Sequence, residues 1–187
     1  MRVAATDLPG VLVIEPEVYR DGRGFFVETY RVDRYREHGM TGPFVQDNQS
    51  RSTFNTLRGL HLQLRHPQGK LLRVIEGKVF DVAVDVRRGS PHFGRWVSVE
   101  LSAENFKQVY VPPGFAHGFC VLSPVAQIEY KCTELYDPDS EIGILWSDPA
   151  IGIAWPVRDP LLSPRDSKHP TLAELGDTLP VWSGTNP

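Results

Sequence analysis

The residues best suited to chemistry are histidines and cations in two short segments. The segment LRGLHLQLRHPQGK contains Arg58, His61 and Lys70, and VPPGFAHGF contributes His117 after a Pro-Gly turn. Histidine is the commonest general base near neutral pH, and a lysine or arginine beside it suits an oxyanion or a phosphate. The spacing therefore favours acid–base chemistry with His61 as the base. The alternative is a histidine that is merely packed among strands.

The same two segments are also similar to the two halves of a cupin barrel. A metal-binding cupin uses two histidines separated by one residue, a glutamate shortly afterwards and a distant histidine. Here Leu62 and Gln63 follow His61, so the close pair of histidines is broken. The ligand count therefore argues against a metal site, and no metal is predicted.

Two further segments are unusually polar. YRDGRGFFVETY contains Arg23 and Glu28, and FVQDNQSRS contains Gln46, Asn48 and Ser50. Asp-Gly and Asp-Asn pairs favour turns through their own backbone hydrogen bonds. Each segment is therefore either a turn or part of a binding surface.

The elements that must position these residues are short runs rich in β-branched and aromatic residues, with turn signals between them. They cover residues 10–19, 24–30, 71–86, 95–102, 107–114, 117–123 and 126–136. This rhythm predicts an all-β sandwich or barrel. Helix is expected only over 32–39, which Gly39 would end, and over the short segment 171–176.

One of these runs has two unlike faces. In KVFDVAVDV, the alternation of a strand puts Val79, Asp81, Ala83 and Asp85 on one face and apolar residues on the other. A face that carries acids is expected to border either solvent or a site.

Length and composition predict a single domain. The chain has 187 residues, enough to bury a core of its own. Residues 156–187 are rich in proline and charge, and we expect them to form an extended C-terminal tail that packs on the barrel.

Charge and cysteine content exclude several classes of protein. The net charge is −3 with the signs interleaved, so a nucleic-acid partner has no basic stripe to bind. No apolar run has membrane-spanning length and the N-terminus does not resemble a signal peptide, which predicts no membrane contact and a cytoplasmic location. Cys120 and Cys132 lie in apolar, strand-like sequence and are interpreted as buried free thiols.

Six segments, in order and at compatible spacing, resemble the dTDP-4-dehydrorhamnose 3,5-epimerase family. They are QDNQSRS, LRGLHLQ, QGKLLRVIEGKVFDVAVDVRRGSPHFGRW, VYVPPGFAHGF, EYKCTELYDP and DPAIGIAWP. The resemblance runs from about Gly10 to about Leu172. It implies a metal-independent, cofactor-free enzyme with a cupin-type jelly-roll barrel and a few short peripheral helices. It also implies a homodimer whose active sites are shared between subunits.

The resemblance assigns the catalytic roles. His61 looks like the base that removes the proton beside the ketone of a dTDP-linked 4-keto-6-deoxy sugar, and Tyr130 like the acid that returns a proton from the opposite face. Lys70 matches the lysine near the carbonyl oxygen. Asp166, in LSPRD, looks like the partner that orients His61, although Asp81 on its strand is an alternative.

The resemblance also implies a set of substrate contacts. Arg23 and Glu28 resemble a nucleotide-contacting pair that reaches in from the neighbouring subunit. The other matching positions are Gln46, Asn48, Arg58, Lys70, His117, Glu141 and Arg165. Phe26 or Tyr136 is a candidate ring for stacking on thymine.

Small departures from the family pattern leave other functions open. LHLQ stands where LHYQ is frequent, and DNQS where DNHS is frequent. The competing functions are a mono-epimerase or ketoisomerase acting on the same type of nucleotide sugar in antibiotic-sugar biosynthesis, a metal cupin oxygenase, and a sugar-nucleotide binder without activity.

Overall fold

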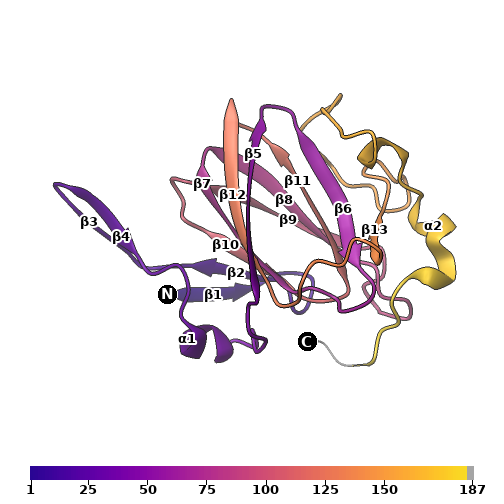
Figure 1. Ribbon diagram of the computed structural model, residues 1–187, viewed down its shortest axis with the longest axis horizontal. Coiled ribbons are helices and arrows are strands. Elements are labelled where there is room, and N and C mark those ends of the chain that lie inside the picture. Colours follow the sequence, from indigo (N-terminus) through magenta and orange to yellow (C-terminus); the bar gives the residue numbers. More distant parts are fainter. Residues whose placement is uncertain (185–187) are drawn as a thin grey trace.

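Two antiparallel sheets face each other in the computed structural model, which describes residues 1–184 (Figure 1). The six-stranded sheet has the order β1 (Arg2–Ala5), β2 (Leu12–Glu15), β10 (Gln108–Val111), β7 (Lys70–Glu76), β12 (Val125–Cys132), β5 (Gln46–Thr53). The five-stranded sheet has the order β13 (Glu141–Gly143), β6 (Leu57–Gln63), β11 (Phe115–Val121), β8 (Lys78–Asp85), β9 (Trp96–Ser102). The all-β class predicted from the sequence is confirmed.

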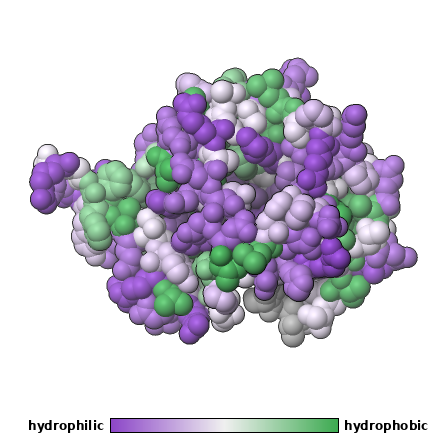
Figure 2. Space-filling view, viewed as in Figure 1, coloured by the Kyte–Doolittle hydropathy of each residue, from purple (hydrophilic) through white to green (hydrophobic). Residues whose placement is uncertain are grey.

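A separate hairpin leaves the body of the molecule. Its strands, β3 (Val18–Asp21) and β4 (Gly24–Val27), project to one side in Figure 1. Phe25 and Phe26 are 58% and 69% exposed on it, and Figure 2 shows apolar surface on this arm. Phe25 packs edge-on against Phe106 of the body, with ring centroids 4.8 Å apart, but the exposed rings still leave apolar surface available for another molecule.

The main core lies between the two sheets. Leu72, Val109 and Ile128 come from the six-stranded sheet, and Phe115 and Val121 come from the five-stranded sheet. Their side chains are almost entirely removed from water. This burial fixes the distance between the sheets, and it therefore fixes the walls of any cavity between them.

The outer face of the five-stranded sheet is also covered. Val82 and Val84 of β8 pack there with Ile151, Leu172 and Leu179 from the C-terminal part of the chain. Strand β8 is thus buried on both faces. Its acidic face does not border solvent: Asp81 and Asp85 are 2% and 0% exposed. Asp81 instead contacts His117, and Asp85 contacts Arg87.

Helix is a minor component, as predicted. Helix α1 covers Val32–Arg36 and is shorter than the expected 32–39, with Gly39 at a positive φ of 85° after its end. Helix α2 covers Leu172–Leu175, and Thr171 and Glu174 cap its start through reciprocal hydrogen bonds. The 3-10 turns η1 (Asp166–Lys168) and η2 (Gly176–Thr178) flank α2. No helix of the described chain is both long enough and apolar enough to cross a membrane.

The C-terminal part of the chain lies against the barrel. Leu161 bridges to Thr56 and Val181 bridges to Arg88, so both ends of the segment are tied by backbone contacts. Figure 1 shows this segment, with α2, beside β13 and β6. Residues 185–187 of the predicted tail lie outside the described residues. The assignment of residues 1–187 to one domain stays a prediction.

Both cysteines, Cys120 and Cys132, are buried and unpaired. Burial raises the pKa of the Cys120 thiol to about 12, so this group stays protonated.

Gly59 allows β6 and β11, the two strands that carry the histidines, to lie close together. Gly59, two residues before His61, has φ of 120°, and a Cβ there would lie 2.6 Å from the Cα of Gly118. We expect Gly59→Ala to lower the free energy of unfolding by at least about 2 kcal/mol, measured by denaturant titration. Gly22→Ala is the control, because no atom lies within 4 Å of the added Cβ. Equal stability of the two variants would contradict this account.

Candidate active site

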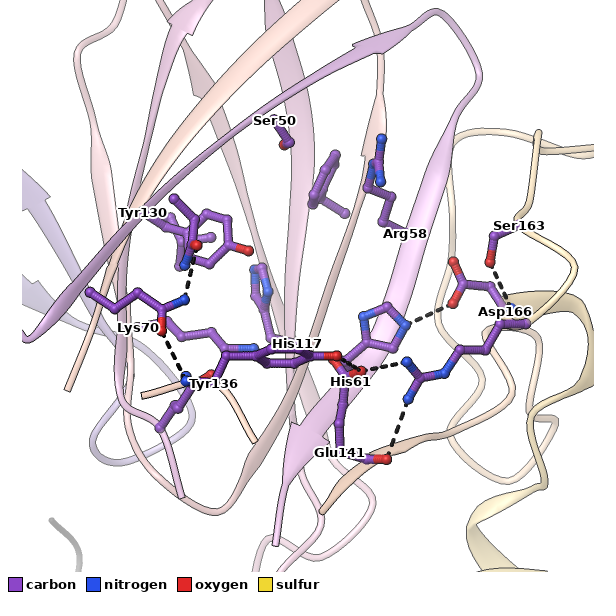
Figure 3. A pocket seen from close by; sticks show the side chains of 16 residues that line it. Ser50, Arg58, His61, Lys70, His117, Tyr130, Tyr136, Glu141, Ser163 and Asp166 are labelled. Atoms are coloured by element: carbon purple, nitrogen blue, oxygen red, sulfur yellow. Dashed lines mark hydrogen bonds and ion pairs between the residues drawn. The ribbon is translucent and has the colours of Figure 1, made fainter. Parts of the chain in front are cut away.

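A cavity of about 450 Å³ opens between the sheets. It is lined by Gln46, Asn48, Ser50, Arg58, His61, Gln68, Lys70, Leu72, His117, Phe119, Tyr130, Tyr136, Glu141, Ser163, Arg165 and Asp166 (Figure 3). Both sheets and the C-terminal segment contribute side chains. The cavity therefore gathers most of the site residues predicted from the sequence.

The two histidines come from neighbouring strands. His61 on β6 and His117 on β11 are directly opposite in the antiparallel pair. His117 is buried and its Nε2 lies 2.9 Å from Asp81 Oδ2. His61 is more open, and its Nε2 lies 2.7 Å from Asp166 Oδ1. Asp166 rather than Asp81 thus contacts His61, although 105 residues separate them in the chain.

Asp166 is held as an acceptor. It begins the short turn η1, and its backbone N–H donates to Ser163 Oγ at 2.9 Å. Burial by itself raises the pKa of Asp166, but the hydrogen bond and charge of His61 and the bonds from Ser163 and His169 leave that pKa below its usual value. The carboxylate is therefore ionised at neutral pH and accepts hydrogen bonds only.

This state of Asp166 decides the tautomer of His61. A nitrogen that hydrogen-bonds to a carboxylate must carry the proton, so Nε2 of His61 is the donor. In the neutral ring, Nδ1 is then unprotonated and able to take a proton. The geometry thus gives His61 one basic nitrogen.

The facing sheet supplies a phenol and an ammonium group. Tyr130 lies on β12 and Lys70 begins β7, the strand next to it. Burial raises the pKa of Tyr130, so its hydroxyl stays protonated and able to donate. Burial also lowers the pKa of Lys70, against the opposing effects of Cys132, Glu141 and Asp81. Figure 3 shows Tyr130 and His61 on opposite sides of the cavity.

The polar segment QDNQSRS is a strand, not a turn. In β5, Gln46, Asn48 and Ser50 alternate with exposed residues and line the cavity. Gln46 Nε2 donates to Asn48 Oδ1 at 3.0 Å. Arg58, on β6, is held by Ser52 at 3.0 Å from its Nε. This wall presents amides, a hydroxyl and a guanidinium, which suit hydroxyl and phosphate groups.

Three polar side chains that contact one another lie at the rim of the cavity. Glu141 Oε2 lies 2.6 Å from Arg165 Nη1 and accepts from the Tyr136 hydroxyl at 3.0 Å. Tyr136 is 48% exposed, so its ring is available for stacking. Phe26, the other candidate ring, lies on the projecting hairpin.

Two predicted site residues do not reach the cavity of their own chain. Arg23 pairs with Asp21 on the hairpin, and Glu28, just after β4, pairs with Arg34 at 3.1 Å. Neither is among the residues that line the cavity. Their assignment therefore depends on a second subunit and stays a prediction.

Among the polar residues near the site, Gln68 and Ser163 on the cavity wall and His169 behind it were not predicted from the sequence, and Ser50 was predicted only as part of a polar segment. Ser50 and Ser163 belong to segments that were recognised, so the alternation of β5 and the turn before Asp166 were usable signals. His169 lies in a segment without periodicity, and nothing in the sequence marks its contact with Asp166.

The described residues include one cluster with the composition of a metal site. His61, Asp166 and His169 offer ligand atoms within 4.8 Å of one another. Both Nε2 atoms lie at hydrogen-bonding distance from the same oxygen, Asp166 Oδ1, at 2.7 and 3.2 Å. A nitrogen that donates a proton has no lone pair for a metal, so this arrangement suits a hydrogen-bonded cluster better than a ligand set.

The barrel and the ring of acid–base groups inside it define an enzyme with a cupin-type jelly roll. The model of the dTDP-4-dehydrorhamnose 3,5-epimerase family matches residues 5–174. The chain belongs to this family.

Individual relatives agree with this assignment. The dTDP-4-dehydrorhamnose 3,5-epimerase of Shigella flexneri is 54% identical over 168 residues, 89% of this chain and 93% of the relative. The enzyme of that name from Neisseria gonorrhoeae is 51% identical over 175 residues, 93% of this chain, which spans only 53% of that relative. A crystal structure of dTDP-6-deoxy-D-glucose-3,5-epimerase from Legionella pneumophila, in complex with dTDP-4-keto-L-rhamnose, superposes with a TM-score of 0.95 at 48% identity. It covers 97% of this chain and 98% of the other.

Proposed function

We propose that the protein inverts carbons 3 and 5 of dTDP-4-dehydro-6-deoxy-D-glucose and so forms dTDP-4-dehydro-L-rhamnose in deoxysugar biosynthesis. The observation that carries the proposal is the position of His61 and Tyr130 on facing sheets around one cavity. An inversion by two groups uses a base on one side of the sugar ring and an acid on the other. A binder without activity needs neither.

In this mechanism His61 Nδ1 removes the proton on the carbon beside the ketone. The electron pair of that C–H bond forms a carbon–carbon double bond, and the ketone oxygen becomes an enolate oxygen. A hydrogen beside a ketone is only weakly acidic in water, so the enolate needs a fixed positive partner. Lys70 has this role, and its burial strengthens the interaction.

Tyr130 completes the inversion. Its hydroxyl gives a proton to the opposite face of the same carbon, while the electron pair on oxygen restores the ketone. The tyrosine then recovers a proton from solvent and His61 releases one. No electron leaves the substrate, so the step needs no redox cofactor.

The remaining polar groups of the cavity bind the nucleotide sugar. Arg58 suits the diphosphate, and Tyr136 at the rim suits the thymine ring. Gln46, Asn48, Lys70, His117, Glu141 and Arg165 complete the substrate contacts. In a homodimer, Arg23 on the hairpin and Glu28 just after it would reach the neighbouring subunit and add nucleotide contacts, in keeping with the apolar exposure of that arm. We assign the enzyme to the cytoplasm.

Proton NMR in deuterium oxide tests this function directly. With dTDP-4-keto-6-deoxyglucose and purified protein, and with no added metal or nicotinamide, we expect the signals at carbons 3 and 5 both to be lost by exchange. Exchange at one carbon would indicate a mono-epimerase. Exchange at neither would favour a metal-dependent oxygenase or a binding protein, and elemental analysis would then identify any metal.

A further inference from the structure

A second histidine lies behind the base. His169 is 8% exposed at its side chain, and its Nε2 lies 3.2 Å from Asp166 Oδ1. This is the same oxygen that accepts from His61 at 2.7 Å. The two rings are nearly perpendicular, at 86°, with centroids 5.6 Å apart. One carboxylate oxygen is therefore fixed by two imidazole donors.

The imidazole ring of His169 fits in its position only because residue 143 is glycine. Gly143 on β13 pairs directly with His61 on β6. A Cβ on Gly143 would lie 2.1, 2.2 and 2.3 Å from Nε2, Cε1 and Cδ2 of His169. The imidazole thus fills the space where the cross-strand neighbour of His61 would carry its side chain. It has little freedom to move away from Asp166.

Asp166 needs such a support, because its backbone belongs to no sheet. It begins a 3-10 turn of three residues in the C-terminal segment. The bond from the Asp166 backbone N–H to Ser163 Oγ and the bond from Lys168 N–H to Arg165 O fix the turn. In the described part of the chain, the side chains of His61 and His169 both contact Oδ1 of this carboxylate.

We propose that His169 is a positioning residue for epimerisation: seated above Gly143, it holds the Asp166 carboxylate, which in turn holds His61 with Nδ1 toward the substrate. This inference rests on the proposed role of His61 as the base. His169 itself is not among the residues that line the cavity, so it acts through Asp166.

The charge of His169 suits this role. The titratable and charged groups that act on it are Asp166, His61 and Arg165. Burial is the largest effect and lowers the pKa of His169, His61 and Arg165 lower it further, and Asp166 opposes them. At neutral pH the ring is therefore uncharged. It donates one hydrogen bond without placing a positive charge beside the base, where such a charge would oppose proton uptake by His61.

Two substitutions at position 169 distinguish the effect of losing the hydrogen bond to Asp166 from the effect of losing the imidazole ring. His169→Leu removes the donor, and His169→Gln keeps an N–H close to the position of Nε2. Removal of a partner that supports a functional histidine costs roughly 10- to 100-fold at metal-bound histidines. We expect a loss of this size in kcat for His169→Leu, with KM changed less than about threefold, and recovery of most of the loss in His169→Gln.

The pH profile provides a readout that a purely structural role would not change. Without the second donor, the negative charge of Asp166 acts more strongly on His61 and favours its protonated form. We therefore expect the acid limb of the kcat/KM profile to move to higher pH in His169→Leu and to return in His169→Gln. Gly143→Ala, which displaces the ring from the other strand, should reproduce the shift. His38→Leu, in an exposed loop, is the control for loss of a histidine.

A spectroscopic measurement separates this proposal from the proposed function. The ¹⁵N shifts of His61 report which ring nitrogen carries the proton, whether or not the enzyme turns over substrate. We expect the Nε2–H form in the native protein and a mixture of tautomers in His169→Leu and Gly143→Ala. An inactive native protein with these spectra would overturn the function and keep the positioning role. Unchanged tautomer and acid limb in folded His169→Leu, or equal defects in the Leu and Gln variants, would overturn the positioning role.

Discussion

His61→Ala is expected to lower the rate of epimerisation by about a thousandfold or more, while dTDP binding changes little. The reason is that general-base catalysis contributes about 10²- to 10⁴-fold. In the proposed binding mode other groups bind the diphosphate, and Arg58 is the cation on the same strand as His61. Deuterium exchange at carbons 3 and 5 measures the rate, and isothermal titration with dTDP measures binding.

The matched control is His38→Ala, because His38 is an exposed histidine after helix α1. It should keep native exchange, binding and thermal stability. Near-native turnover by His61→Ala would exclude His61 as the base. A parallel loss of dTDP binding would instead place this ring against the nucleotide.

Tyr130→Phe is expected to separate two events that occur together in the native enzyme. The variant loses only a hydroxyl, so His61 can still remove a proton and return a deuteron to the same face. Exchange beside the ketone should therefore continue, whereas inversion should fall by about 10²-fold or more, because the opposite face has lost its donor. The measurement compares the exchange rate with the rate of product formation in the same NMR experiment.

Tyr110→Phe is a suitable control, since Tyr110 is buried in a different cluster, with Ile14 and Tyr35. It should change neither rate. If exchange and inversion both vanished in Tyr130→Phe, the tyrosine would have to act before or during proton removal. If both persisted, another donor would face that side of the ring.

Much of the site could be predicted because its parts lie in short, recognisable segments. Arg58, His61 and Lys70 fall within one stretch of strand and turn, and Gln46 and Asn48 alternate along another. The choice between Asp166 and Asp81 could not be made, because both are acids within reach of the barrel and only the folded chain shows which one approaches His61. His169 was missed for a similar reason: its contact depends on the space above Gly143.

The fold was predicted better in class than in detail. Alternation in 78–86 correctly separated the acids from the apolar residues, but the acidic face is buried and the apolar face is covered by Ile151, Leu172 and Leu179. Sequence alternation reports which face is apolar, and it does not report which segment will cover it. The predicted run 24–30 includes β4, but only the first two residues of β3 were predicted as strand, and the sequence did not indicate that the two strands form a hairpin projecting from the body.

The C-terminal segment makes the proposed active site depend on the part of the chain that is synthesised last. The last strand of the barrel ends at Gly143, but Ser163, Asp166 and His169 follow it and reach His61 only when the segment docks on the outer sheet. A nascent chain that has formed every strand would still lack an oriented base. If the proposed roles of His61 and Asp166 hold, turnover therefore requires the docked C-terminal segment as well as the two sheets.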